Sequence, residues 1–285
     1  MPEARGAAPV REHETLPPPA RLEPAVEPAP QPSLRRTLEL LFSLAESDLR
    51  ARYGRGPWRL VKWLLDPFAV AGVYLVLVAV LLERPGRAPG LSIACAIVPF
   101  QILMMIVVNG QNAVQVRRSI ILNMAFPRSL IPVAAVLTEA LSFLASLVLL
   151  ALMMGLYGIA LTVSVLWLPL VLAMNLALAT AIAYPASLVG VWIPDLRPFV
   201  VSFVRTLFFL APGLIALDQI GGTAHDLIKL NPMTGLFEGY RSVLLYGHAP
   251  AAWELLYPLA VAALMLAVFV PIYRREQKQF AKVVE

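Results

Sequence analysis

The chain has 285 residues, of which 59% are hydrophobic and only 14% are charged, and its mean hydropathy is +0.74. A soluble domain is about 45–50% apolar and about 25% charged, so these proportions argue against a soluble enzyme. A single soluble core also cannot enclose this much apolar surface, because the surface-to-volume ratio limits the fraction that is buried. The composition therefore indicates a protein that crosses a membrane several times.

The placement of the charges argues against a nucleic-acid-binding protein, and the placement of the cysteine and histidines argues against a metalloprotein. The net charge is +5, with a balance of −2 in residues 1–32 and of +7 in the rest of the chain. Most basic residues flank apolar runs, which is a pattern of membrane topology and not of a nucleic-acid surface. Cys95 is the lone cysteine, and the three histidines show no metal-ligand spacing. We therefore expect no metal site and no nucleic-acid partner.

The N-terminal part contains two segments of different character. Residues 1–32 hold nine of the 25 prolines, which is typical of a disordered tail, here expected in the cytoplasm. In residues 33–53 apolar side chains recur at spacings of three and four, which predicts an amphipathic helix. Its stripe consists of Leu34, Leu38, Leu41, Ala45 and Leu49. We expect the segment 33–56 to lie in the membrane interface, with a soluble helix that packs on a partner as the alternative.

Six apolar runs reach the length of about 20 residues that a spanning helix needs. The expected spans are 63–82, 91–114, 130–156, 165–191, 199–217 and 251–272, within a transmembrane domain 57–275. Segments that flank the spans on one side carry 13 Lys and Arg residues, and those on the other side carry four. Because positive charge gathers in the cytoplasm, both termini, including residues 276–285, are predicted to be cytoplasmic. The predicted fold is an all-α polytopic membrane protein with six transmembrane helices.

Residues 218–250, between the last two spans, are unusual for an external loop. The stretch 227–245 is partly apolar, is broken by an Asn-Pro pair at 231–232, and carries several charges. It is too short and too polar for two full spans, so we expect two re-entrant half-helices that form an external gate. Glu238 and Arg241 lie three residues apart, a spacing that favours a local ion pair of structural function.

Some polar residues fall within the predicted spans. Glu139 and Arg205 lie deep enough for an unpaired charge to be costly, so we expect them to pair or to face a hydrated cavity. For Arg205 the alternative is that its long side chain reaches the near interface. Gln111, Asn112 and Gln115 share one helical face and are expected to form interhelical hydrogen bonds or to line a polar conduit.

The sequence lacks the motifs of several enzyme classes. It has no G-x-x-x-x-G-K-[ST] motif and so cannot bind ATP through a P-loop, and it has neither H-E-x-x-H nor G-x-S-x-G. The chain is therefore predicted not to be an enzyme and to carry no cofactor, with any ATP and Mg²⁺ bound by another chain. The loop 117–129 has an apolar middle between basic ends, which predicts a short surface helix that docks into a soluble partner. The alternative is a loop whose arginines bind lipid headgroups.

Five segments, taken in their order, resemble one family. They are DLRARYGRG at the end of the amphipathic helix, WRLVKWLLDPF at the first span, FPRSLIPV at the third, VWIPDLRPFV after the fourth, and the external NPMTGLFEGYRSVLLYG. Together they resemble the membrane subunit of type-2 ABC exporters that move polysaccharides, such as O-antigen and teichoic-acid permeases. The resemblance covers about residues 34–275.

The resemblance implies a homodimer of this chain, two copies of a separate ABC ATPase, and a lipid-linked glycan that passes between the permease copies in a bacterial inner or plasma membrane. It also implies site residues in three groups. The group near the lateral access route is Arg50, Arg52, Tyr53 and Arg55; the coupling helix holds Arg117, Arg118, Asn123 and Pro127; the external gate holds Asn231, Pro232, Gly235, Glu238, Tyr240 and Arg241.

Arginine offers permanently charged, planar donors that suit phosphate. Arg50, Arg52, Arg55 and Arg59 are therefore expected to bring the diphosphate end of the substrate to the access route, with ordinary positive-inside charge as the alternative. Three other functions stay open. The same architecture would serve export of a drug or a small lipid. An integral-membrane glycosyltransferase would need a catalytic cluster, and an ion-coupled carrier usually shows internal repeats; neither feature is evident.

Overall fold

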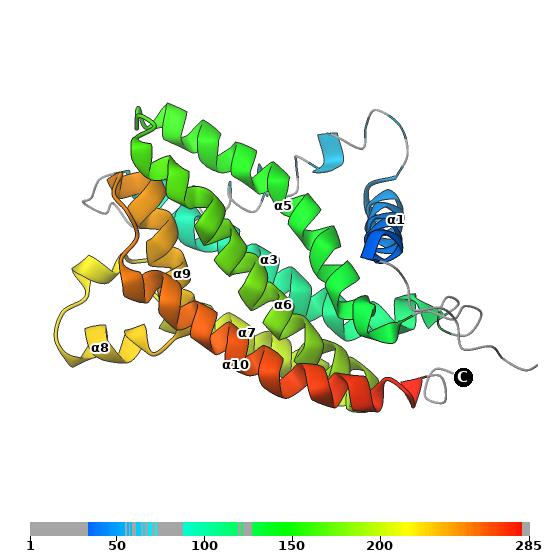
Figure 1. Cartoon of the computed structure of the whole chain (residues 1–285). Coiled ribbons are helices and arrows are strands. Elements are labelled where there is room, and N and C mark those ends of the chain that lie inside the picture. The colour runs from blue at the N-terminus through cyan, green and yellow to red at the C-terminus, as the bar shows by residue number, and fades with distance from the viewer. Residues whose placement is uncertain are drawn as a thin grey trace, which may run out of the picture. The chain divides into compact units, whose positions relative to one another are not determined.

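The computed structural model describes residues 34–54, isolated positions between 56 and 72, residues 88–118, Ile121 and residues 127–280. This part of the chain is built from helices (Figure 1). The α-helices are α1 (Leu34–Tyr53), α3 (Pro89–Val116), α5 (Ile131–Leu156), α6 (Leu168–Trp192), α7 (Arg197–Leu210), α8 (Thr223–Lys229), α9 (Pro232–Arg241) and α10 (Ala252–Glu276). The prediction of an all-helical chain agrees with the described residues.

Four of these helical segments are long and apolar enough to cross a bilayer. They are Pro89–Val116, Arg128–Leu156, Val163–Trp192 and Ala252–Glu276. They coincide with the second, third, fourth and sixth predicted spans, so the chain is a multi-pass membrane protein. Most of the first predicted span, 63–82, lies outside the described residues.

The fifth predicted span is shorter than expected. α7 has 14 residues, a length of about 21 Å that is less than the hydrocarbon thickness of about 30 Å. The helix ends at Leu210 because Pro212 disfavours the helical conformation in the residue before it, and Ala211 is extended with φ −89° and ψ 165°. The described residues therefore do not show one continuous helix over 199–217, and the fifth span stays a prediction.

α3 is the central helix of the bundle. It packs against α5, α6, α7 and α9, and 72% of its most apolar window is buried, against 17% for α10. The backbones of α3 and α6 approach closely at Gly190, where a Cβ atom would lie 1.8 Å from the carbonyl oxygen of Gln111. Small residues permit such approaches between membrane helices.

α1 packs on α5 through one face. Its buried residues Leu41, Ala45, Leu49 and Tyr53 recur every four positions, which confirms the predicted helix and most of its apolar stripe. Leu38, which the spacing predicts on the same stripe, is 55% exposed. The stripe contacts a helix of its own chain, which neither of the two predicted environments included.

The segment 218–250 contains two short helices, α8 with seven residues and α9 with ten. α9 is buried from Met233 to Arg241 and packs against α3 and α10. Its start is capped by Asn231, whose Oδ1 accepts a hydrogen bond from the backbone N–H of Met233 at 3.0 Å, and Pro232 occupies the first turn. The segment Ser242–Tyr246 continues α9 as a π-helix.

Candidate functional site

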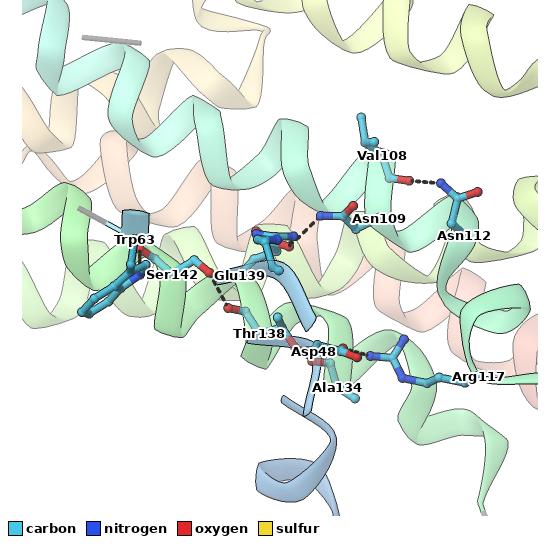
Figure 2. A network of polar contacts seen from close by, with 11 residues as sticks. Asp48, Trp63, Val108, Asn109, Asn112, Arg117, Ala134, Thr138, Glu139 and Ser142 are labelled. Carbon is cyan, nitrogen blue, oxygen red and sulfur yellow. Dashed lines mark hydrogen bonds and ion pairs between the residues drawn. The ribbon is translucent and has the colours of Figure 1, made fainter. Parts of the chain in front are cut away.

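Six polar side chains from three helices meet where α1 lies on α5 and beside the end of α3 (Figure 2). We call this group the α1 charge cluster. It consists of Asp48 and Arg52 on α1, Asn109 and Arg117 at the end of α3, and Thr138 and Glu139 on α5.

The first ion pair of the cluster joins Arg52 to Glu139. The Nη2 and Nη1 groups of Arg52 donate to Oε1 and Oε2 of Glu139 at 2.5 and 3.1 Å, and Nδ2 of Asn109 donates to Oε1 at 2.7 Å. The Glu139 side chain is 4% exposed and that of Arg52 is 30% exposed. This two-pronged contact is the strong form of a charge pair, and its hydrogen bonds raise the pKa of Arg52 above its ordinary value.

Glu139 thus pairs with Arg52, and the predicted pair with Arg205 is wrong. Arg205 lies on an exposed face of α7. The positions of the two charges within their predicted spans suggested similar depths in the membrane. The helix that covers Glu139 is instead α1, which lies outside the predicted spans. The alternative for Arg205, in which its long side chain reaches the near interface, stays a prediction.

The second ion pair joins Arg117 to Asp48. The Nη2 group of Arg117 donates to Oδ2 of Asp48, and the Thr138 hydroxyl donates to the same oxygen at 3.2 Å. The Nη1 group of Arg117 donates to the carbonyl oxygen of Ala113 at 3.2 Å. Arg117 is the C-cap of α3, a position at which the helix dipole favours a cation. Its side chain is 5% exposed and that of Asp48 is 29% exposed.

The turn between α6 and α7 is attached to the same end of α3. The Nη1 group of Arg197 donates to Oδ1 of Asn112 at 3.1 Å, and its Nη2 group donates to the carbonyl oxygen of Gly190 at 2.5 Å. Nε2 of Gln111 donates to the carbonyl oxygen of Arg197 at 3.5 Å. Interhelical hydrogen bonding, one of the two roles expected of the polar face, is thus observed for Gln111 and Asn112, while Gln115 is exposed.

A second charged group, the α9 cluster, is formed by Glu238, Arg241 and Ser92. Arg241 Nη1 donates to Glu238 Oε1 at 2.7 Å, and Arg241 Nε donates to the carbonyl and hydroxyl oxygens of Ser92, both at 3.1 Å. The guanidinium also donates to the carbonyl oxygen of Gly213 at 3.3 Å. The backbone N–H of Leu217 donates to Glu238 at 3.0 Å. The local pair forms as its spacing predicts, and it attaches α9 to α3 and to the segment after α7.

Hollows of different character lie beside α1. A cavity of about 310 Å³ is lined by members of the α1 charge cluster together with Asn112 and Val116. An apolar groove of about 550 Å³ is lined by residues of α1 and α5 and by Trp63. Among the described residues, no group of three or more His, Cys, Asp or Glu side chains is arranged to hold a metal.

Comparison with known proteins gives relatives of one kind. No family model matches the chain. The O-antigen export system permease protein RfbA of Myxococcus xanthus is 28% identical over 246 residues, which are 85% of this chain and 94% of the relative. Two proteins of the same name from Klebsiella pneumoniae are 23% and 22% identical over 210 residues, which are 73% of this chain and 81% of each relative.

The chain is a homologue of O-antigen export permeases. The homology extends over most of the chain and confirms the resemblance drawn from the sequence segments. The relatives are permeases, and permease subunits are not catalytic, which agrees with the prediction that the chain is not an enzyme.

The structure of this permease homologue brings some predicted site residues together and leaves others apart. Tyr53 is buried beside Arg52, whose guanidinium carbon lies 5.9 Å from the centre of the Tyr53 ring. Arg50 is on the exposed side of α1, where it pairs with Glu46. Arg55, Arg59 and Asn123 lie outside the described residues.

The sequence interpretation did not include Asp48, Asn109 and Thr138 among the site residues. A signal for Asp48 is present, because it carries a charge opposite to that of Arg52 one helical turn away. Asn109 and Thr138 gave no comparable signal, since their partners lie 30 and 90 residues away in the chain. Gly235 serves close packing, because a Cβ atom there would lie 2.9 Å from the carbonyl oxygen of Glu254.

Proposed function

We propose that this chain is the transmembrane permease subunit of an ATP-driven exporter that moves a lipid-linked polysaccharide from the cytoplasm across the bacterial inner or plasma membrane. The observation that carries this proposal is the homology to an O-antigen export permease over 94% of that relative's length. The long apolar helices support a conducting body within the bilayer. A sequence without a P-loop motif supports an energy source on a separate chain.

The proposed assembly is a homodimer of this chain with two copies of an ABC ATPase subunit that bind ATP and Mg²⁺. Six spans with both termini in the cytoplasm, including the tail 1–32, complete the proposed topology. α7 exposes Phe199, Phe203 and Phe209 on one chain. Large apolar side chains left exposed on a helix have to be covered by lipid or protein, which supports a second permease copy or the bilayer around it.

The proposed substrate-access residues are Arg50, Arg52, Tyr53, Arg55 and Arg59. Arg52 uses two of its five N–H donors on Glu139, and its side chain is 30% exposed, so a phosphate oxygen can approach the open side of the guanidinium. Arg50 pairs with Glu46 on the exposed side of α1, where a weak surface pair yields readily to a lipid diphosphate. These charges form the basic face that such a headgroup would meet.

The proposed ATPase-coupling residues are Arg117, Arg118, Asn123 and Pro127, which lie on the connection between α3 and α5. The proposed external gate consists of α8 and α9 with Asn231, Pro232, Gly235, Glu238, Tyr240 and Arg241, as re-entrant helices. The burial of α9 and the complete pairing of its charges support a re-entrant position, because membrane-embedded backbone and charges need partners inside the protein.

Gene deletion in the host bacterium tests the proposed function. We expect loss of the surface polysaccharide and accumulation of the lipid-linked glycan on the cytoplasmic side, measured by immunoblot of intact cells and by extraction of the lipid carrier. A strain in which the partner ATPase carries a P-loop Lys→Ala substitution is the matched control and should show the same two changes. Normal surface glycan in the deletion strain, with altered resistance to a drug or altered small lipids, would favour the alternative exporter.

A further inference from the structure

In both ion pairs of the α1 charge cluster, one partner is nearly buried and the other is more exposed to solvent. In each pair the nearly buried partner belongs to the membrane body, namely Glu139 on α5 and Arg117 at the end of α3. In each pair the more exposed partner belongs to α1, namely Arg52 and Asp48. α1 therefore supplies the counter-ions for two charges that the bundle buries.

The order of the charges determines where α1 can lie along α5. Asp48 and Arg52 are four residues apart, which is about one turn and about 6 Å along the helix. If α1 slid by one turn in one direction, Asp48 would face Glu139; in the other direction, Arg52 would face Arg117. Either slide places like charges together and leaves the second buried charge without a counter-ion, a costly arrangement in a membrane protein.

The apolar contacts of α1 distinguish neighbouring registers less sharply than the charges do. Leu41, Ala45, Leu49 and Tyr53 recur every four residues, so a slide by one turn brings one apolar residue into the place of the next. Apolar packing thus selects the face of α1 that meets α5, but it discriminates weakly between neighbouring registers. Charge complementarity is a known means of fixing the register of packed helices.

We propose that Asp48 and Arg52 are positioning residues that hold α1 in a single register on α5 and beside the end of α3. The proposal deepens the proposed function and rests on it, because α1 carries the proposed access arginine Arg50 and Arg117 begins the proposed coupling connection. Through the two ion pairs, a movement of the coupling connection is passed directly to α1. Arg52 thereby contributes to transport by holding α1 in place on α5, as well as through any contact with substrate.

Cysteine cross-linking measures the register without reference to transport. In a Cys95→Ala background, Ala45→Cys is combined with one cysteine at successive turns of α5, at Ala134, Thr138 or Ser142, and disulfide formation is followed in membranes. One position should dominate. Interchange of the α1 charges (Asp48→Arg with Arg52→Asp) should lower cross-linking at that position at least about five-fold. The disulfide should then form mainly one turn away on α5, or at several of the tested positions.

Two further variants decide the outcome. Adding the matching interchange on the body (Arg117→Asp with Glu139→Arg) should return the dominant position to the original one, which shows that the altered chain still folds. Interchange of the exposed pair on the same helix (Arg35→Glu with Glu39→Arg) is the matched control and should change nothing. A cross-linking pattern that the Asp48–Arg52 interchange leaves unaltered would overturn the proposal.

Export is the second readout, measured as surface glycan in the complemented deletion strain. The α1 interchange should reduce export at least about ten-fold, whereas the Arg35–Glu39 interchange should leave export unchanged, because neither residue is among the proposed access or coupling residues. Full export in spite of a shifted register would refute the positioning role. If the unaltered chain supports no glycan export, the proposed function fails, while the cross-linking result still tests the register.

Discussion

The α1 charge cluster and the α9 cluster both pair an arginine with a glutamate, yet they hold different parts of the molecule. In the α9 cluster the partners are three residues apart and their side chains are 0% and 9% exposed. In the α1 charge cluster Arg52 and Glu139 are 87 residues apart, and Arg52 is partly open to solvent. The enclosed pair is part of the internal packing of the bundle, whereas the half-open pairs attach a separate helix to its side. The first stabilises the fold, and the second fixes the place of one element.

The largest expected effect follows from removal of Arg241. Arg241→Ala leaves the Glu238 carboxylate buried without its cation and removes the bonds to Ser92 and Gly213. We expect a loss of about 3–5 kcal/mol in the free energy of unfolding, measured by SDS titration of the detergent-purified chain. Arg241→Lys keeps the charge but loses the forked geometry, and its loss should be intermediate. If Arg241→Ala unfolds at the same SDS midpoint as the unaltered chain, the enclosed pair is not important for stability.

The next effect concerns Arg52. Arg52→Ala leaves Glu139 with Asn109 as its remaining donor, and we expect a loss of about 2–3 kcal/mol, reduced by the partial exposure of the arginine. Arg52→Ala combined with Glu139→Gln should recover part of this loss, because the buried charge disappears together with its partner. The same titration measures both variants. If the double variant is less stable than Arg52→Ala, the loss does not arise from an unpaired carboxylate.

Packing of α9 provides a steric prediction for the enclosed region. Gly235→Ala places a Cβ atom 2.9 Å from the Glu254 carbonyl oxygen and from Cγ of Pro258, so α9 and α10 must separate. We expect a loss of about 1–3 kcal/mol. Gly155→Ala on α5 is the control, since a Cβ atom there meets nothing within 4 Å, and it should cause no loss. Equal unfolding midpoints for the two alanine variants would contradict the close approach of α9 to α10.

The smallest effect is expected for an exposed pair on α1. Arg35 and Glu39 form an i, i+4 ion pair whose side chains are largely exposed. Arg35→Ala should change the free energy of unfolding by no more than about 0.5 kcal/mol, and added salt should remove even this difference. A larger, salt-independent loss would show that this end of α1 also makes a contact with the bundle.

Local patterns in the sequence predicted much of the fold and only part of the site. Apolar length identified four spans, the spacing of three and four identified α1, and the i, i+3 spacing identified the Glu238–Arg241 pair. Hydropathy did not predict the end of α7 at Leu210, because the apolar run continues through Pro212 although the helical backbone conformation ends before it. The partner of Glu139 was missed for another reason. Which helix covers a buried charge depends on tertiary packing, and Arg52 is 87 residues distant.

Reconstitution tests the central claim most directly. Purified permease is placed in proteoliposomes with and without the partner ATPase, the lipid-linked glycan is supplied on the ATPase side, and the amount of glycan protected inside the vesicles is measured after ATP is added. We expect ATP-dependent protection when both subunits are present and none with the permease alone. ATP-independent accumulation by the permease alone, or no accumulation by the complete complex with its own lipid-linked glycan, would contradict a permease driven by nucleotide hydrolysis on another chain.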